Sequence, residues 1–330
     1  MNTLLPDYSE IEKIFIVSPI GTRENLWDEF EFFINVLSGI IDKKDKGQRI
    51  VVVCESDSSK NITEEKLINK HNVDFFVCKV SDIWIRDYFS CANMVTDNCK
   101  ELTTLKGLYH PSYNSHYAAI DDAAGTILSQ KFFENICTLP FKLDGGNVIS
   151  NSDYMFISEN LYKENFYFGK GVINKFFEDD FKQKLVTLPT EILDVVGHTD
   201  CILRFIDDKT ILLPIYDATY RVDNRYIMTV KRQLVETLGV DYNYIFLPSY
   251  LDDQINDDNI FSAKGLYLNY FRFEDNIIFP SFEGLKDYET EIVRIINKVA
   301  PNLILYFSPC DKIAFEGGCF NCITNTKYKV

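Results

Sequence analysis

Residues 14–19 read IFIVSP, residues 50–53 read IVVV, and the segment between them carries apolar residues at helical spacing. These apolar positions are Leu26, Phe30, Phe33, Ile34, Leu37 and Ile41. The spacing places them on one face of a helix, and the flanking apolar runs are typical of buried strands. The stretch therefore predicts a strand, a helix and a second strand, which is the unit of an α/β fold.

The same unit recurs twice further along the chain. The copies comprise residues 211–214, 225–238 and 244–248, and residues 277–280, 288–299 and 303–307. Between the first and second copies, residues 121–133 predict a helix and residues 155–158 a short strand. Repetition at this scale indicates one repeated architecture rather than two unlike domains. Because no Pro-, Gly- or Ser-rich linker interrupts the chain, we expect residues 1–330 to form a single domain.

The composition excludes several functional classes. Lys and Arg number 34 against 49 Asp and Glu, and this net charge of −15 disfavours nucleic-acid binding, which needs clustered cations. An acidic chain suits a cationic partner better. No apolar run approaches the roughly 18 residues of a membrane helix, and no signal peptide is visible. The nine irregularly spaced cysteines indicate a reducing compartment, so we expect a cytoplasmic protein that binds neither nucleic acid nor membranes.

One of only four histidines lies two residues before a carboxylate, in the sequence Gly-His198-x-Asp200. Histidine is the common acid–base group near neutral pH, so the short supply draws attention to this position. In an extended segment positions i and i+2 share a face, and both side chains can point into one pocket. A solvated turn is the plainer interpretation of the same residues.

A second cluster of acidic and aromatic residues lies at residues 82–89. If the segment is extended, Asp82, Trp84 and Arg86 lie on one side, with Asp87 next to them. A carboxylate pairs with a planar guanidinium and an indole face attracts positive charge, so the cluster can hold an organic cation. The plainer interpretation is an edge strand with an ion pair between Arg86 and an aspartate.

Two glycine pairs adjoin polar residues. Asp144 precedes the first, which Asn147 follows, and the second precedes Cys319 and Cys322. Paired glycines permit turns and close backbone approach. For the two cysteines three interpretations stay open: a zinc half-site, a redox pair, and a nucleophile held as thiolate by His198 and nearby charge.

The motifs follow one order along the chain: Trp84-x-Arg86-Asp87, Asp144-Gly-Gly-Asn147, Gly-His198-x-Asp200 and Gly-Gly-x-x-x-Cys322-x-Thr324. In this order the chain resembles the guanidine deiminases, and more narrowly the group that joins agmatine deiminases with bacterial-type peptidyl-arginine deiminases. The resemblance spans nearly the whole chain. It implies the pentein fold, an α/β propeller of five pseudo-repeated ββαβ units around a central active site.

The resemblance also implies a role for each residue. Cys322 is the expected nucleophile, His198 the general acid and base, and Asp144 the carboxylate that orients the histidine. The expected substrate-binding residues are Trp84, Asp87, Asp200 and Asn147. A thiolate attacks a guanidinium carbon held between carboxylates, and this chemistry requires neither a metal nor a cofactor.

The chain departs from agmatine deiminases at three places. Asp144 stands where they commonly have Glu, Asn321 where they have His, and Tyr88-Phe89-Ser90 where they have Thr-Gly-Pro. The Arg-Asp-Tyr, Gly-Gly-Asn and Gly-His-x-Asp-Cys details look closer to the peptidyl-arginine branch. The reaction class is therefore better supported than the substrate.

We expect a small cationic guanidino substrate, agmatine or an arginine-like compound. The lack of a visible export signal favours agmatine, which would give N-carbamoylputrescine and ammonia. Deimination of peptidyl or free arginine to citrulline is the alternative. An amidinotransferase and a catalytically silent binding protein on the same fold are further alternatives, and a homo-oligomer is left open.

Overall fold

A computed structural model describes residues 1–44, 46–96, 99–111, 117–190, 196–257 and 259–330. Its first strand–helix–strand unit is the predicted one, with β2 (Ile11–Val17), α1 (Trp27–Lys44) and β3 (Arg49–Cys54). The predicted apolar face of α1 is buried from Phe30 to Ile41. A short 3-10 helix, η1 (Glu24–Leu26), leads into α1.

The second and third predicted units are also present. In each, an antiparallel pair of strands is followed by a helix and by a strand parallel to the second, since a parallel neighbour requires a crossover. One unit contains β11 (Arg204–Asp207), β12 (Thr210–Ile215), α7 (Arg221–Leu238) and β13 (Asn243–Pro248). The other contains β14 (Phe271–Phe273), β15 (Asn276–Ser281), α8 (Lys286–Val299) and β16 (Ile304–Pro309).

The middle of the chain repeats the same order twice more. One unit contains β5 (Ala92–Thr96), β6 (Cys99–Leu108), the crossover helix α4 (Ala118–Phe132) and β7 (Asn135–Lys142). The strand β1 (Asn2–Leu4) is added at the edge of its sheet. The next contains β8 (Ile149–Ser150), β9 (Tyr154–Ser158), α5 (Asn160–Glu164), α6 (Lys170–Asp180) and β10 (Lys184–Leu188). The predicted helix at residues 121–133 and strand at residues 155–158 are therefore confirmed.

The C-terminal strand completes the first sheet. The C-terminal strand β17 (Thr324–Tyr328) pairs antiparallel with β2, and β3 pairs parallel with β4 (Val73–Val77), after α2 (Asp57–Lys66). The short helix α9 (Asp311–Phe315) leads into the loop before β17. This closure places Cys322 beside the first sheet.

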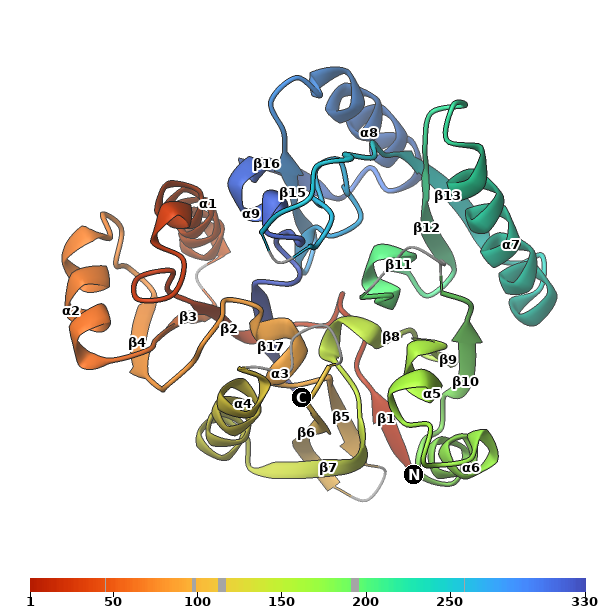
Figure 1. The fold of residues 1–330 in the computed structure, drawn as a ribbon, viewed down its shortest axis with the longest axis horizontal. Helices are drawn as coiled ribbons and strands as arrows, with labels where there is room; N and C mark the ends of the chain where they lie inside the picture. Colours follow the sequence, from red (N-terminus) through yellow and green to blue (C-terminus); the bar gives the residue numbers. More distant parts are fainter. Residues whose placement is uncertain (45, 97–98, 112–116, 191–195, 258) are drawn as a thin grey trace.

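In the described residues the strands form five separate sheets of three or four strands. Figure 1 shows them around the middle of the molecule, with α1, α7 and α8 on the outside and the one-turn helix α3 (Ile85–Tyr88) near the centre. The mixed α/β class and the ββαβ order are confirmed, whereas closure into a propeller stays a prediction. No helix in the described part of the chain is long and apolar enough to span a membrane.

Candidate active site

Cys322 lies at the end of the loop between α9 and β17, and only 7% of its surface is exposed. The preceding glycine pair fits this loop to its surroundings. Gly317 has a φ of +105°, which side chains rarely adopt. A Cβ on Gly318 would lie 2.7 Å from the Trp84 ring and 3.2 Å from Cys322 Sγ. The second glycine therefore lets Trp84 and Cys322 approach each other.

Asn269 is fully buried and holds the Cys322 loop in place. Its Oδ1 accepts hydrogen bonds from the backbone N–H of Cys319 (3.1 Å) and Cys322 (3.3 Å). Its Nδ2 donates to Cys322 Sγ and to Asp200 Oδ2, both at 3.2 Å. No motif in the sequence identified Asn269; the available signal was an amide inside the otherwise apolar and aromatic stretch LYLNY at residues 266–270.

His198 lies between two carboxylates. Its Nε2 is 3.1 Å from Asp144 Oδ2 and its Nδ1 is 3.6 Å from Asp87 Oδ1. The backbone N–H of Gly146 donates to Asp87 Oδ1 (3.0 Å), and a Cβ at Gly146 would come within 2.6 Å of His198 Nδ1. Glycine is therefore required at position 146 for the carboxylate and the imidazole to meet.

Asp200 is fully buried, and hydrogen bonds reach both of its oxygens. Asn321 Nδ2 donates to Oδ2 at 2.6 Å, in addition to the bond from Asn269, and Cys201 Sγ donates to Oδ1 at 3.4 Å. Asn321, where agmatine deiminases have His, thus orients this carboxylate. The short 3-10 helix η3 (Thr199–Cys201) carries Asp200 immediately after His198.

The site carries excess negative charge. Burial, together with repulsion from Asp144 and Asp200, raises the pKa of Asp87 to about 7 against the attraction of His198. Burial alone would lower the pKa of His198, but Asp87, Asp144 and Asp200 together raise it to about 10. Burial and the charges of Asp200 and Asp87 raise the pKa of Cys322, which the hydrogen bond from Asn269 partly offsets. A bound cation would oppose these shifts for the thiol and for Asp87.

The predicted extended conformation of residues 82–89 is wrong, and so is the edge-strand alternative. Ile85–Tyr88 form one helical turn, α3, with a hydrogen bond from the Phe89 N–H to the Ile85 carbonyl. Arg86 therefore donates from Nε to the carbonyl of Asn321. Asp82 pairs instead with Arg23 (2.8 and 3.0 Å), which also contacts Glu316. Local alternation could not reveal this turn, because contacts with distant segments stabilise it.

Asn147 belongs to the 3-10 helix η2 (Gly145–Asn147) and is buried. Its Oδ1 accepts hydrogen bonds from Ser158 N–H (2.8 Å) and Thr199 Oγ1 (2.9 Å). It thus links the segment after Asp144 to the segment that carries His198. These bonds support a positioning role, and contact with substrate stays a prediction.

Cys319 is fully buried, and its thiol points to the carbonyl of Ala263 at 3.7 Å. In the described residues no three His, Cys, Asp or Glu side chains are grouped as metal ligands. Of the two cysteines, Cys322 is the one that shares the Asn269 amide with Asp200. The arrangement around it, with an acid–base group and carboxylates, suits covalent attack on a cationic carbon centre.

Comparisons with known proteins identify structures with a similar fold. A cysteine-to-serine variant of the C. jejuni agmatine deiminase, with substrate bound, superposes with a TM-score of 0.82 at 19% identity, covering 100% of this chain and 97% of that one. The agmatine deiminase of Enterococcus faecalis gives 0.81 at 14% identity, covering 99% and 96%. At these identities the likeness establishes a shared fold and nothing more. No curated protein matches in sequence.

A family model describes the chain more directly. The model of the Porphyromonas-type peptidyl-arginine deiminases matches residues 4–327, which include all four motifs and every element of the site. The protein therefore belongs to the Porphyromonas-type peptidyl-arginine deiminase family.

Proposed function

We propose that this protein hydrolyses a guanidino group to a ureido group and ammonia, through a covalent intermediate on Cys322. One observation carries the proposal: three carboxylates, Asp87, Asp144 and Asp200, lie around one imidazole and one thiol in a buried site. Buried charges need partners, and a protonated His198 offsets only one of the three. A planar organic cation supplies the missing charge.

Binding would prepare the nucleophile. Asp87 and Asp200 would grip the guanidinium, while Trp84, held against the loop by Gly318, would form a wall of the pocket. The arriving positive charge lowers the pKa of Asp87 and of the Cys322 thiol, both of which the folded chain raises. Substrate would therefore promote the thiolate that attacks it.

The chemistry divides into two halves. First, the Cys322 Sγ–carbon bond forms, His198 gives a proton to the leaving nitrogen, the carbon–nitrogen bond breaks, and ammonia departs. Next, water attacks the thiouronium carbon, His198 takes one proton from it, and the carbon–sulfur bond breaks. The second proton passes to the departing sulfur or to solvent, and the ureido product forms. Because Asp144 holds Nε2, the proton would move through Nδ1, on the side of Asp87.

For the substrate we propose agmatine, because an acidic protein attracts a ligand with two positive charges more than it attracts zwitterionic arginine. Long-range attraction is screened over about 8 Å at physiological salt, so groups at the far end of the pocket must supply most of the preference. Deimination of peptidyl-arginine is the second candidate, supported by the description of the family.

Competition among agmatine, free arginine and a blocked arginyl peptide, at fixed ionic strength, tests the proposal. We expect a ureido product and ammonia from agmatine at the highest kcat/KM, and none from the Cys322→Ala variant. Faster turnover of the peptide would replace agmatine by the second candidate. Product that forms only with an added amine would indicate an amidinotransferase, and no product from any substrate would indicate a binding protein.

A further inference from the structure

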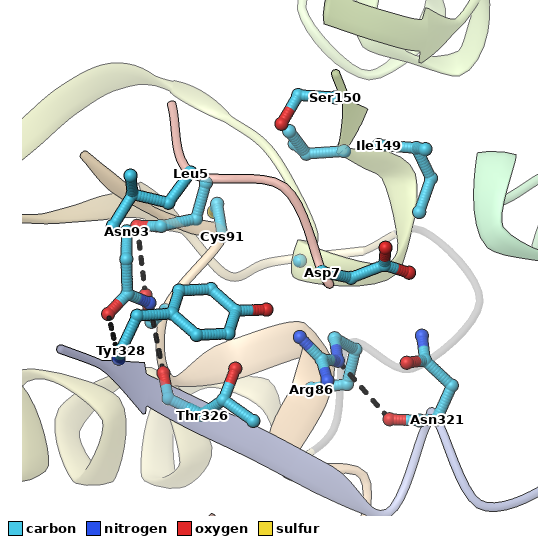
Figure 2. Close-up of a pocket in the computed structure, with 14 residues that line it drawn as sticks. Leu5, Asp7, Arg86, Cys91, Asn93, Ile149, Ser150, Asn321, Thr326 and Tyr328 are labelled. Atoms are coloured by element: carbon cyan, nitrogen blue, oxygen red, sulfur yellow. Dashed lines mark hydrogen bonds between the residues drawn. The ribbon is translucent and has the colours of Figure 1, made fainter. Parts of the chain in front are cut away.

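A cavity of about 40 Å³ with a mixed polar and apolar lining lies behind the candidate active site. We call it the Arg86 cavity; its lining includes Asp7, Arg86, Ser90, Asn93, Ser150 and Tyr328. In Figure 2 the Arg86 guanidinium lies between Tyr328 and Asn321. One ordered water needs roughly 10–15 Å³ and two to four polar partners, so the cavity has room for about three.

One polar group of the lining requires water. Asp7 Oδ1 is buried and has no hydrogen-bond partner among the described residues, although Asp7 Oδ2 pairs with Arg204. A buried carboxylate oxygen without a partner is costly unless water reaches it. Leu5, Asp7, Arg86 and Ala92 are half-buried rather than fully buried, so the cavity adjoins the surface of the molecule.

The wall between the cavity and the catalytic groups is one residue thick. Asn321 lines the cavity, and its Nδ2 bonds Asp200. Arg86 lines it as well, and its N–H donates to the carbonyl of Cys322 (3.1 Å). Gly145 lies on the same wall, immediately before the Gly146 N–H that holds Asp87. The residues that hold Asp200, Cys322 and Asp87 in place therefore also border this cavity.

We propose that the Arg86 cavity supplies the water that hydrolyses the covalent intermediate, along a path past Asn321. The inference rests on the proposed function. Under the proposed function Trp84 forms a wall of the substrate pocket, so an alkyl chain that remains bound in the intermediate would displace water from that side. A second reservoir then delivers the attacking water, whose proton His198 accepts as the carbon–sulfur bond breaks. The first half of the reaction needs no water and is independent of the cavity.

The test fills the cavity without touching a catalytic group. Ala92→Leu and Ser150→Val each add apolar volume to its lining, and Ala218→Leu makes the same change as the first at an exposed position. Each variant is mixed with the substrate that the wild type turns over, quenched in acid, and followed by intact mass for the adduct on Cys322. Thermal unfolding identifies the variants that fold.

We expect adduct hydrolysis to slow about tenfold in Ala92→Leu and Ser150→Val, while adduct formation and labelling by a haloacetamidine stay within twofold of the wild type. Ala218→Leu should match the wild type throughout. If either cavity variant folds and hydrolyses the adduct at the wild-type rate, the inference about the cavity is overturned, whereas the proposed function is not. A wild-type protein that forms neither adduct nor ureido product overturns the proposed function, and this inference with it.

Discussion

Two buried ionic clusters lie on opposite sides of the segment at residues 268–270, and they differ in charge balance. Arg204 is 1% exposed, and its Nε and Nη2 donate hydrogen bonds to Asp7. Its Nη1 donates to the carbonyls of Leu268 and Tyr270. Its guanidinium lies 4.3 Å from the centre of the Tyr270 ring. Asn269, between those two carbonyls, reaches the catalytic cluster instead. One cluster has its guanidinium built in, and the other has three carboxylates with one imidazole.

The difference in charge balance distinguishes a cluster that stabilises the fold from one that is suited to bind a ligand. In the Arg204 cluster the cation has a carboxylate, two carbonyls and an aromatic face, so the folded chain completes it. In the candidate catalytic cluster the folded chain places one imidazole among three carboxylates, and the pKa of Asp87 is raised. Under the proposed function a bound guanidinium supplies the further positive charge. Recognition of a guanidinium by a carboxylate is thus a permanent part of the fold at Arg204, and under the proposed function it is the basis of substrate binding at the second cluster.

The largest expected effect is on activity, from the thiol of the catalytic cluster. Cys322→Ala should lower turnover by on the order of 10⁵-fold or more, because no other group forms the covalent bond. Stability should change little, since the Arg204 cluster is untouched. A ureido-product assay and thermal unfolding measure both, with Cys137→Ala on β7 as the control. Substantial activity in Cys322→Ala would contradict the assigned nucleophile.

The second effect is on stability, from the Arg204 cluster. Arg204→Met leaves the half-buried Asp7 without its cation and the carbonyls of Leu268 and Tyr270 without their donor, so the free energy of unfolding should fall by about 1–3 kcal/mol. Arg294→Met removes an exposed pair with Glu291 and should cost about 0.3–0.5 kcal/mol. Urea denaturation of both variants provides the measurement. Equal losses would show that the Arg204 cluster is no more important than a surface ion pair.

The third effect is the pH dependence of guanidinium binding in the Cys322→Ala background. Asp87 must be ionised to bind the cation, and its pKa of about 7 means that it is largely protonated at lower pH. Affinity should therefore fall by up to tenfold for each pH unit below 7 and level off above it. His198, with a pKa of about 10, stays protonated in this window. Calorimetry from pH 5.5 to 8.5 measures the slope.

The matched variant for this measurement is Asp87→Asn, which keeps the shape of the side chain and removes its charge. It should bind the guanidinium weakly at every pH in the window and lose the slope. A slope that survives the substitution would assign the titration to another group and would remove Asp87 from the guanidinium clamp.

The smallest effect concerns the residue that joins the two clusters. Asn269→Asp keeps the oxygen that accepts from Cys319 and Cys322 but replaces the amide that donates to Cys322 Sγ. The thiol pKa should rise, and the midpoint of the pH profile for Cys322 alkylation should move up by about one unit. Asn135→Asp on β7 is the control. An unchanged midpoint would limit Asn269 to holding the loop.

The first helix and its flanking strands could be predicted because the spacing of apolar residues within each segment specifies which face is buried. The apolar spacing from Leu26 to Ile41 and the flanking strands reproduce α1, β2 and β3 to within a few residues, since burial of one face follows directly from a helical period. The residues His198, Asp87, Asp144, Asp200 and Cys322 were found through short motifs. The motifs fix which residue types are present, but not how they meet.

Contacts between distant segments decided the rest. Asn269 reaches Cys322 across 53 positions, and Arg86 reaches Asn321 across 235, so no local period reports either. The turn at Ile85–Tyr88, the pairing of Asp82 with Arg23, and the Arg86 cavity arise in the same way. The sequence by itself determined the α/β units, the acidic balance and the set of reactive side chains. Only the tertiary structure decided which carboxylates share one histidine, because the burial and mutual repulsion that raise the pKa of Asp87 exist only where separate segments of the chain converge.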